Sequence, residues 1–265
     1  MSCCPFTPRG RHTPPQSCTD EAYAERRRPC GLPPESTFTT QPELAQERLT
    51  VVVKSQVRRC RWVVADEAFG DYPGFLESMV GLVLWYGAEV PHHTWIWHER
   101  PVTRLPSWRG RGRHPQQERL VAGAPEARTV LGVAAALPAE PWARQTLKEG
   151  SPRPMVAECA ARRVVAVRAV LPGPDVWVVL RRQVETGELK TSLCHAPIDT
   201  AVATLVRMSG RRGPLETCLE DGQPRLGMGE YAGRSWTGWH HHMTLGILAH
   251  FFVVRLNLRL KKPQP

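Results

Sequence analysis

The stretch RWVVADEAFGDYPGFLESMVGLVLWYGAEV, residues 61–90, decides the fold. It begins with a short apolar run, Trp62–Ala65, that is typical of a strand and ends on Asp66. A helix is predicted to start near Pro73, where a missing N–H costs little, and a second apolar strand follows at residues 82–90. This order indicates parallel pairing in an α/β layer, whose ligand sites lie at the carboxyl ends of the strands. Asp66 has such a position, although an Asp at a strand end is, by itself, more typical of a turn or a helix cap.

The residues before this stretch divide into a leader and a helix. Residues 1–38 are rich in Pro, Cys, Ser and Arg without periodicity, which predicts an extended or disordered leader. Thr40 and Glu43 then have the spacing of a capping box. They predict a helix of about 12 to 15 residues.

The residues after it change in character twice. Residues 91–200 contain short β-like runs broken by Pro and Gly, which we interpret as an inserted β-rich subdomain. Residues 201–262 contain helix-forming stretches and end in a long helix, whose apolar residues recur at steps of three or four: Trp239, Met243, Ile247, Phe251, Val254 and Leu258. The predicted parts are the leader 1–38, a core segment 39–90, the insertion 91–200 and a C-terminal helical part 201–262.

The charge of the chain favours a polyanionic partner. The formal net charge is +10, and only five of the 35 basic residues are lysines, the rest being arginines. Arginine suits bidentate contact with phosphate, so nucleic acid is the first candidate, although codon bias in a GC-rich genome also raises the arginine content. The eight cysteines include no C-x-x-C pair, so the sequence predicts neither a zinc module nor a disulfide scaffold. The longest apolar run is too short to span a bilayer, and we expect a cytoplasmic protein without a membrane partner.

Six motifs occur together in a fixed order: RWVVADEAFGDYPGFL, LWYGAEVP, GELKTSLCHAP, GRRGPLETCLEDG, LGMGEY and SWTGWHHHMTLGILAHFFVVRL. In order and spacing they resemble the DDE-type insertion-sequence transposases, specifically the insertion sequence 701-like family. The resemblance covers residues 30–262. It implies an α/β fold with a ribonuclease-H-like catalytic core, interrupted by a β-rich insertion and completed by a long C-terminal helix.

The resemblance also implies a metal-dependent reaction on DNA. Such transposases cut and join transposon ends with two divalent cations, expected to be Mg²⁺, held about 4 Å apart by two Asp and one Glu. Asp66 matches the second Asp and Glu216 the Glu, so both are predicted catalytic residues and metal ligands. Arg212 matches a phosphate-binding Arg of the same motif. The Tyr and Lys of that motif are replaced by Ser209 and Gln223.

A basic loop supplies further candidates for DNA contact. Residues 106–119, PSWRGRGRHPQQER, place Arg109, Arg111 and Arg113 among glycines. These arginines are candidates for binding phosphate, and the simpler alternative is a solvated loop.

The first Asp of the family pattern has no counterpart in this chain, because the segment that precedes residue 39 already resembles a region downstream of it. We therefore expect an incomplete core and a truncated, inactive copy of a transposase. The partners are expected to be DNA, specifically transposon ends, and a further transposase subunit in a homo-oligomer. Two other interpretations are a non-catalytic remnant that binds DNA or a transposase, and a product without function.

Overall fold

We describe a computed structural model of the chain, which places residues 28–33, 36, 38–56, 60–108, 110–138, 142–148, 155–210, 226–233 and 235–260. The chain divides into two compact units. Residues 46–212 form one, and residues 1–45 together with 213–265 form the other. Each is described by itself.

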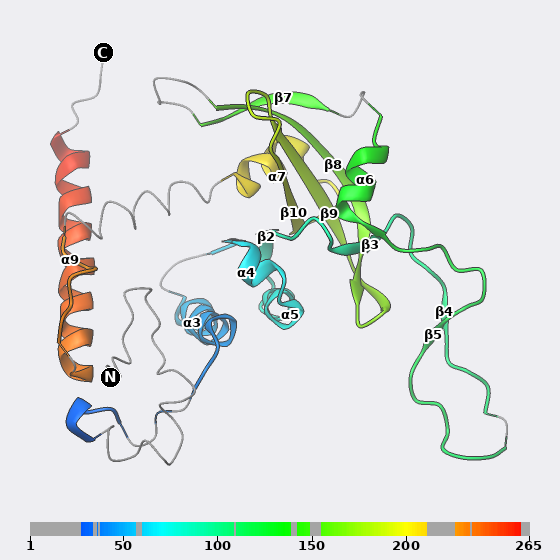
Figure 1. Cartoon of the computed structure of the whole chain (residues 1–265), viewed down its shortest axis with the longest axis horizontal. Coiled ribbons are helices and arrows are strands. Elements are labelled where there is room, and N and C mark those ends of the chain that lie inside the picture. The colour runs from blue at the N-terminus through cyan, green and yellow to red at the C-terminus, as the bar shows by residue number, and fades with distance from the viewer. Residues whose placement is uncertain are drawn as a thin grey trace. The chain divides into compact units, whose positions relative to one another are not determined.

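The larger unit is built on one mixed sheet with the strand order β1-β2-β10-β9-β8-β3-β6, and β7 pairs with β8 (Figure 1). Its first two strands are parallel, and the pairs β2–β10, β10–β9, β9–β8, β8–β3, β3–β6 and β7–β8 are antiparallel. The strands span Trp62–Ala65 (β1), Trp85–Glu89 (β2), Trp95–Trp97 (β3), Arg128–Thr129 (β6), Ala143–Lys148 (β7), Met155–Arg168 (β8), Leu171–Gln183 (β9) and Leu189–His195 (β10). The predicted mixture of strands and helices is confirmed.

Two helices connect the parallel strands, as the sequence predicts. The short α4, Glu67–Gly70, follows β1 directly, and α5, Pro73–Gly81, leads into β2. Pro73 occupies the first turn of α5, where its missing N–H is tolerated. The apolar residues Phe75, Leu76 and Met79 are buried, so the crossover is held by the core.

Helices cover the two faces of the sheet. On β9, Val178 and Leu180 belong to a buried cluster with Val130 and Val133 of α6, Val130–Ala136. Val179, which alternates with them, belongs to another cluster with Leu205 and Val206 of α7, Val202–Ser209. Because successive residues of a strand point to opposite faces, α6 and α7 pack against opposite faces of the sheet.

Residues 91–200, which the sequence predicts to be β-rich, contain most of the described strands, and the long ones join the sheet that the preceding segment begins. Ser192, Leu193, Cys194 and His195 of β10 pair antiparallel with β2. The long strands β8, β9 and β10 therefore extend the sheet of β1 and β2. The boundaries between a core and an insertion stay a prediction.

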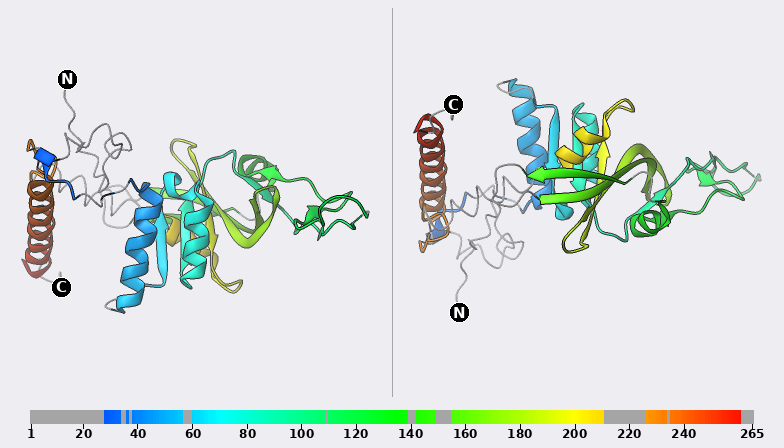
Figure 2. Two further views of the ribbon diagram at one scale, coloured as in Figure 1. Left: turned by 90° about the horizontal axis from the view of Figure 1, so that it is seen from below. Right: turned by 90° about the horizontal axis from the view of Figure 1, so that it is seen from above.

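A two-stranded arm leaves this sheet. Its strands, Thr103–Arg104 (β4) and Arg119–Leu120 (β5), pair only with each other among the described strands. Both views in Figure 2, like Figure 1, show the arm extending away from the large sheet. We call residues 98–127 the β4–β5 arm.

The remaining helices begin and end close to the predicted positions. The helix α3, Gln41–Ser55, crosses the boundary between the units and starts with the predicted capping box, in which Thr40 N–H donates to Glu43 Oε2 at 2.8 Å. The long helix α9 spans Trp236–Leu260, and a 3-10 turn, η2, spans Arg28–Cys30. Most of the predicted leader lies outside the described residues. Among the helices that the structure describes, none has the length and apolarity needed to cross a membrane.

Candidate active site

Asp66 lies directly after β1 and caps α4. Its backbone is extended, with φ −83° and ψ 179°, and its Oδ1 accepts a hydrogen bond from Phe69 N–H at 3.3 Å. The capping interpretation of this residue is therefore correct. It leaves most of the lone pairs of the partly exposed carboxylate available, because an ionised carboxyl group offers about four acceptor positions. The cap and a bound cation are compatible.

Glu89 is the neighbour of Asp66 at the carboxyl edge of the parallel strands. In the register of these strands Ala65 lies beside Ala88, so the next residue along each is Asp66 and Glu89. Sites in α/β sheets form at this edge. The structure thus adds a second carboxyl group to the place where the sequence predicted only one.

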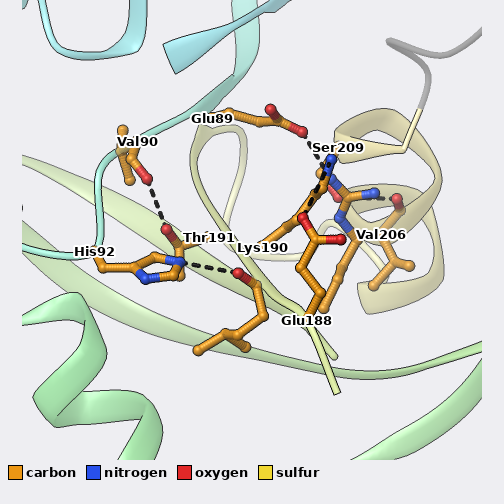
Figure 3. A network of polar contacts seen from close by, with 10 residues as sticks. Glu89, Val90, His92, Glu188, Lys190, Thr191, Val206 and Ser209 are labelled. Atoms are coloured by element: carbon orange, nitrogen blue, oxygen red, sulfur yellow. Dashed lines mark hydrogen bonds and ion pairs between the residues drawn. The ribbon is translucent and has the colours of Figure 1, made fainter. Parts of the chain in front are cut away.

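The Glu89 carboxylate forms a buried ion pair. Its Oε1 accepts a hydrogen bond from Arg181 Nη2 of β9 at 3.0 Å, and the side chains of Glu89 and Arg181 are 14% and 9% exposed. The pair crosses from β2 to β9, two strands away in the sheet. Figure 3 shows Glu89 together with neighbouring polar contacts, including the 2.7 Å hydrogen bond from Thr191 Oγ1 to Val90 O and that from Ser209 Oγ to Val206 O.

The end of α7 lies against the same arginine. A Cβ atom placed on Gly210 would be 3.5 Å from Arg181 Nη1, and one on Gly87 would be 3.9 Å from Ser209 N. Arg181 Nε is buried and has no hydrogen-bond partner among the described residues. The guanidinium group therefore lies between the carboxyl end of β2 and the point where the chain leaves α7.

Two thiols share this face but stay protonated. Burial raises the pKa of Cys159 to about 11 and that of Cys194 to about 12, and the charge of Arg181 acts weakly in the opposite direction. A thiol must be deprotonated to attack or to bind a metal. Neither thiol offers that chemistry near neutral pH.

The opposite side of β2 and β10 is also desolvated. Tyr86 stacks on His195, with ring centroids 5.7 Å apart, and burial raises the pKa of Tyr86 to about 12. Burial, helped by Arg163, lowers the pKa of His195. Both side chains are therefore uncharged around pH 7, and uncharged rings can pack against each other in the interior.

The basic loop forms the tip of the β4–β5 arm and is ordered by an aromatic stack. Trp108 and His114 stack with centroids 4.2 Å apart, and Trp108 Nε1 donates to Gly112 O at 3.1 Å. Arg111 and Arg113 are exposed on this turn, and Arg113 Nη2 also donates to Gln116 Oε1 at 2.8 Å. The tip therefore presents two described cations to solvent.

Only some of the predicted site residues lie in the described part of the chain. Outside it are Arg109, Arg212 and Glu216, whose positions relative to Asp66 the structure does not describe. Within the described part of the chain, no three His, Cys, Asp or Glu residues are grouped as a metal site would require. Asp66, with its hard oxygen donors, fits one ligand position for a divalent cation.

Sequence reasoning missed Glu89 and Arg181. The available signal was a charged residue at the end of each of two apolar runs, WYGAEV and VWVVLRRQ. Their pairing could not be read from it, because 92 residues separate them along the chain.

In α/β folds, ligands bind at the carboxyl edge of the parallel strands, and in this mixed sheet Asp66 lies at that edge. Residues 3–154, more than half of the chain, match the family described as DDE superfamily endonuclease, and the chain belongs to this family. The matched segment contains Asp66, Glu89 and the arm, and it ends before Arg181 and Glu216. No curated protein matches the sequence. Membership supports a nuclease of transposase type, which acts on DNA and typically uses a divalent metal.

Proposed function

We propose that this chain is an insertion-sequence transposase of the 701-like type, built to cut and join DNA at transposon ends. The observation that carries the proposal is Asp66, a partly exposed carboxylate at the carboxyl edge of β1 and β2 in a DDE endonuclease domain. When bound, Mg²⁺ would stabilise the attacking and leaving oxygens of an in-line phosphoryl displacement. Asp66 would hold the cation while it continues to cap α4.

Glu216 is the second ligand in this proposal, and Arg212 binds a phosphate beside it. The last described residue before them is Gly210, which lies against Arg181 near the end of β2. Glu216 is assigned from its match to the Glu of the family motif and from its spacing to Arg212.

The arm supplies the contact with the DNA backbone. Arg109, Arg111 and Arg113 would neutralise phosphates, since arginine binds phosphate oxygens in a bidentate manner. Assembly of the chain into a homo-oligomer stays a prediction.

A second candidate function is DNA binding without cleavage, and Ser209 favours it. This residue occupies the position of the family's Tyr, but it is buried, and its hydroxyl donates to Val206 O at 2.9 Å within α7. It therefore offers no group to a substrate. With Gln223 in place of the Lys, the chain retains fewer contacts for the reacting phosphate, in line with the expected loss of activity.

Nicking of a duplex that carries a transposon end tests both candidates. The variant Asp66→Asn removes a metal ligand but keeps a good helix cap, so it is expected to fold normally and lose Mg²⁺-dependent nicking. Glu67→Gln, at the exposed next residue, is the matched control, and Glu216→Ala tests the second ligand. Nicking that survives Asp66→Asn overturns the assignment, salt-sensitive binding without nicking supports the second candidate, and a chain that neither binds nor nicks DNA overturns both.

A further inference from the structure

The Glu89–Arg181 pair is a buried ion pair on a face of the sheet whose other buried residues are largely apolar. Among these apolar residues are Val179, Leu205 and Val206. A buried ion pair is often no more stabilising than apolar side chains of similar size, because both charges lose their hydration. Stability alone therefore gives little reason for a charged pair at this place, and its position suggests another role.

The pair joins three parts of the structure that converge on the candidate site. Glu89 ends β2 next to Asp66 in the register of the parallel strands. Its backbone carbonyl also lies directly against Gly70, the last residue of the helix that Asp66 caps. Arg181 in turn lies against Gly210, where the chain leaves α7 toward Glu216.

Arg181 has one donor to spare for this junction. Its Nη2 binds Glu89, whereas its buried Nε has no partner among the described residues. A buried donor without an acceptor is costly, so a guanidinium group in this state is suited to hold a further acceptor at the same point.

We propose that Glu89 and Arg181 form a positioning pair, which fixes the end of β2 and the end of α7 and thereby holds α4, with Asp66 at its start, in place at the edge of the sheet. The pair does not touch the cation or the DNA. It acts as an outer layer that orients ligands, a type of contact whose loss lowers metal affinity by roughly 10-fold to 100-fold. This inference rests on the proposed metal-dependent function.

The double variant Glu89→Met/Arg181→Met tests the role of the pair. It removes both charges of the ion pair together, so neither is left buried without the other, and the protein is expected to unfold at a similar or higher denaturant concentration than the wild type. Binding of Mn²⁺ alone and Mg²⁺-dependent nicking are measured on the same preparations. Glu77→Met/Arg168→Met is the control, because Arg168 of β8 pairs with Glu77 of α5 at 3.4 Å and neither residue belongs to β2, β9 or α7.

We expect the double variant to fold and to bind Mn²⁺ at least 10-fold more weakly than the wild type, a loss that the control does not show. A well-folded double variant with unchanged Mn²⁺ affinity and nicking overturns the positioning role and leaves the proposed function standing. A wild-type chain that neither binds Mn²⁺ nor nicks DNA overturns the metal-dependent function, and the positioning role with it.

Discussion

Gly70, the last residue of α4, lies against the backbone carbonyl of Glu89, the last residue of β2, so closely that a Cβ atom on Gly70 would overlap that oxygen. The contact joins the helix that Asp66 begins to the strand beside it. The absence of a side chain at residue 70 is therefore what allows α4 to fold back onto the sheet.

Substitution of this glycine is expected to be costly. Gly70→Ala should lower the free energy of unfolding by about 2 to 3 kcal/mol, because backbone atoms on both sides must move to admit the methyl group. Gly81→Ala is the matched control, since Gly81 also ends a helix but has no atom within 4 Å of its Cβ position. That variant should be neutral or slightly stabilising. Denaturant unfolding of the two variants checks the prediction, and equal effects would contradict it.

Acidification is expected to weaken the start of α3. Hydrogen bonds from the Thr40 hydroxyl and backbone N–H lower the pKa of Glu43 below its ordinary value of 4.5. The charged form is thus favoured in the folded helix. Its contribution is fully present above the unfolded pKa and is lost as the pH falls through the lower folded value.

Titration of Glu43 measures this effect. An NMR titration of the carboxyl group should give a midpoint below 4.5, and helix content at residues 41–45 should fall in parallel. In Thr40→Ala the midpoint should return toward the ordinary value, because the hydroxyl donor is lost. An unchanged midpoint in that variant would exclude the capping box as the cause.

Local elements were predictable because their signals lie within a few residues. Trp62–Ala65 is a strand in both the prediction and the structure, Pro73 begins the predicted helix, and Thr40 forms the predicted cap. Each depends on hydrophobic run length, the geometry of proline or a contact three residues away. The second strand is shorter than predicted, because the chain turns before Trp85 and residues 82–84 are not part of the strand.

Long-range pairing was not predictable from one sequence. The sequence predicted an inserted β-rich subdomain but not the pairing of β10 with β2, because these strands lie about 100 residues apart. The Glu89–Arg181 pair has the same origin, since β9 must first reach its place in the sheet. For the candidate site, sequence reasoning found Asp66 from its place at a strand end and missed the charged pair beside it.

Buried and exposed cysteines are expected to differ sharply in reactivity. Cys194 is fully buried and its pKa is raised to about 12, whereas Cys60 is exposed. At about pH 8 only a minute fraction of the Cys194 thiol is ionised, and a reagent cannot reach it without local unfolding. Brief alkylation followed by peptide mass spectrometry should label Cys60 and leave Cys194 unmodified. Labelling of Cys194 in guanidinium chloride serves as the control, and equal labelling in the native protein would contradict the burial.

The arm is expected to bind duplex DNA through phosphate contacts. Apart from Pro101, its described residues are not buried, so the arm contributes little to the core, and its exposed tip carries Arg111 and Arg113. Arg111→Gln/Arg113→Gln should weaken binding to all sequences alike. It should also reduce the slope of log affinity against log salt by about 2, since each phosphate contact contributes roughly 0.9. Fluorescence anisotropy with a labelled duplex at several salt concentrations measures both quantities.

Substitution of Trp108 distinguishes the effect of net charge on DNA binding from the effect of the geometry of the arm's tip. Trp108→Ala removes the stack on His114 and the hydrogen bond to Gly112 but no charge, so it should weaken binding by loosening the turn that presents the arginines. The charge control is Arg144→Gln/Arg182→Gln, which removes two arginines that already pair with Glu158 outside the arm. If this control lowers affinity and salt slope as much as Arg111→Gln/Arg113→Gln, binding depends on total charge alone. In that case the arm has no special role, because a contact made at the tip would be lost only when the arginines of the tip are removed.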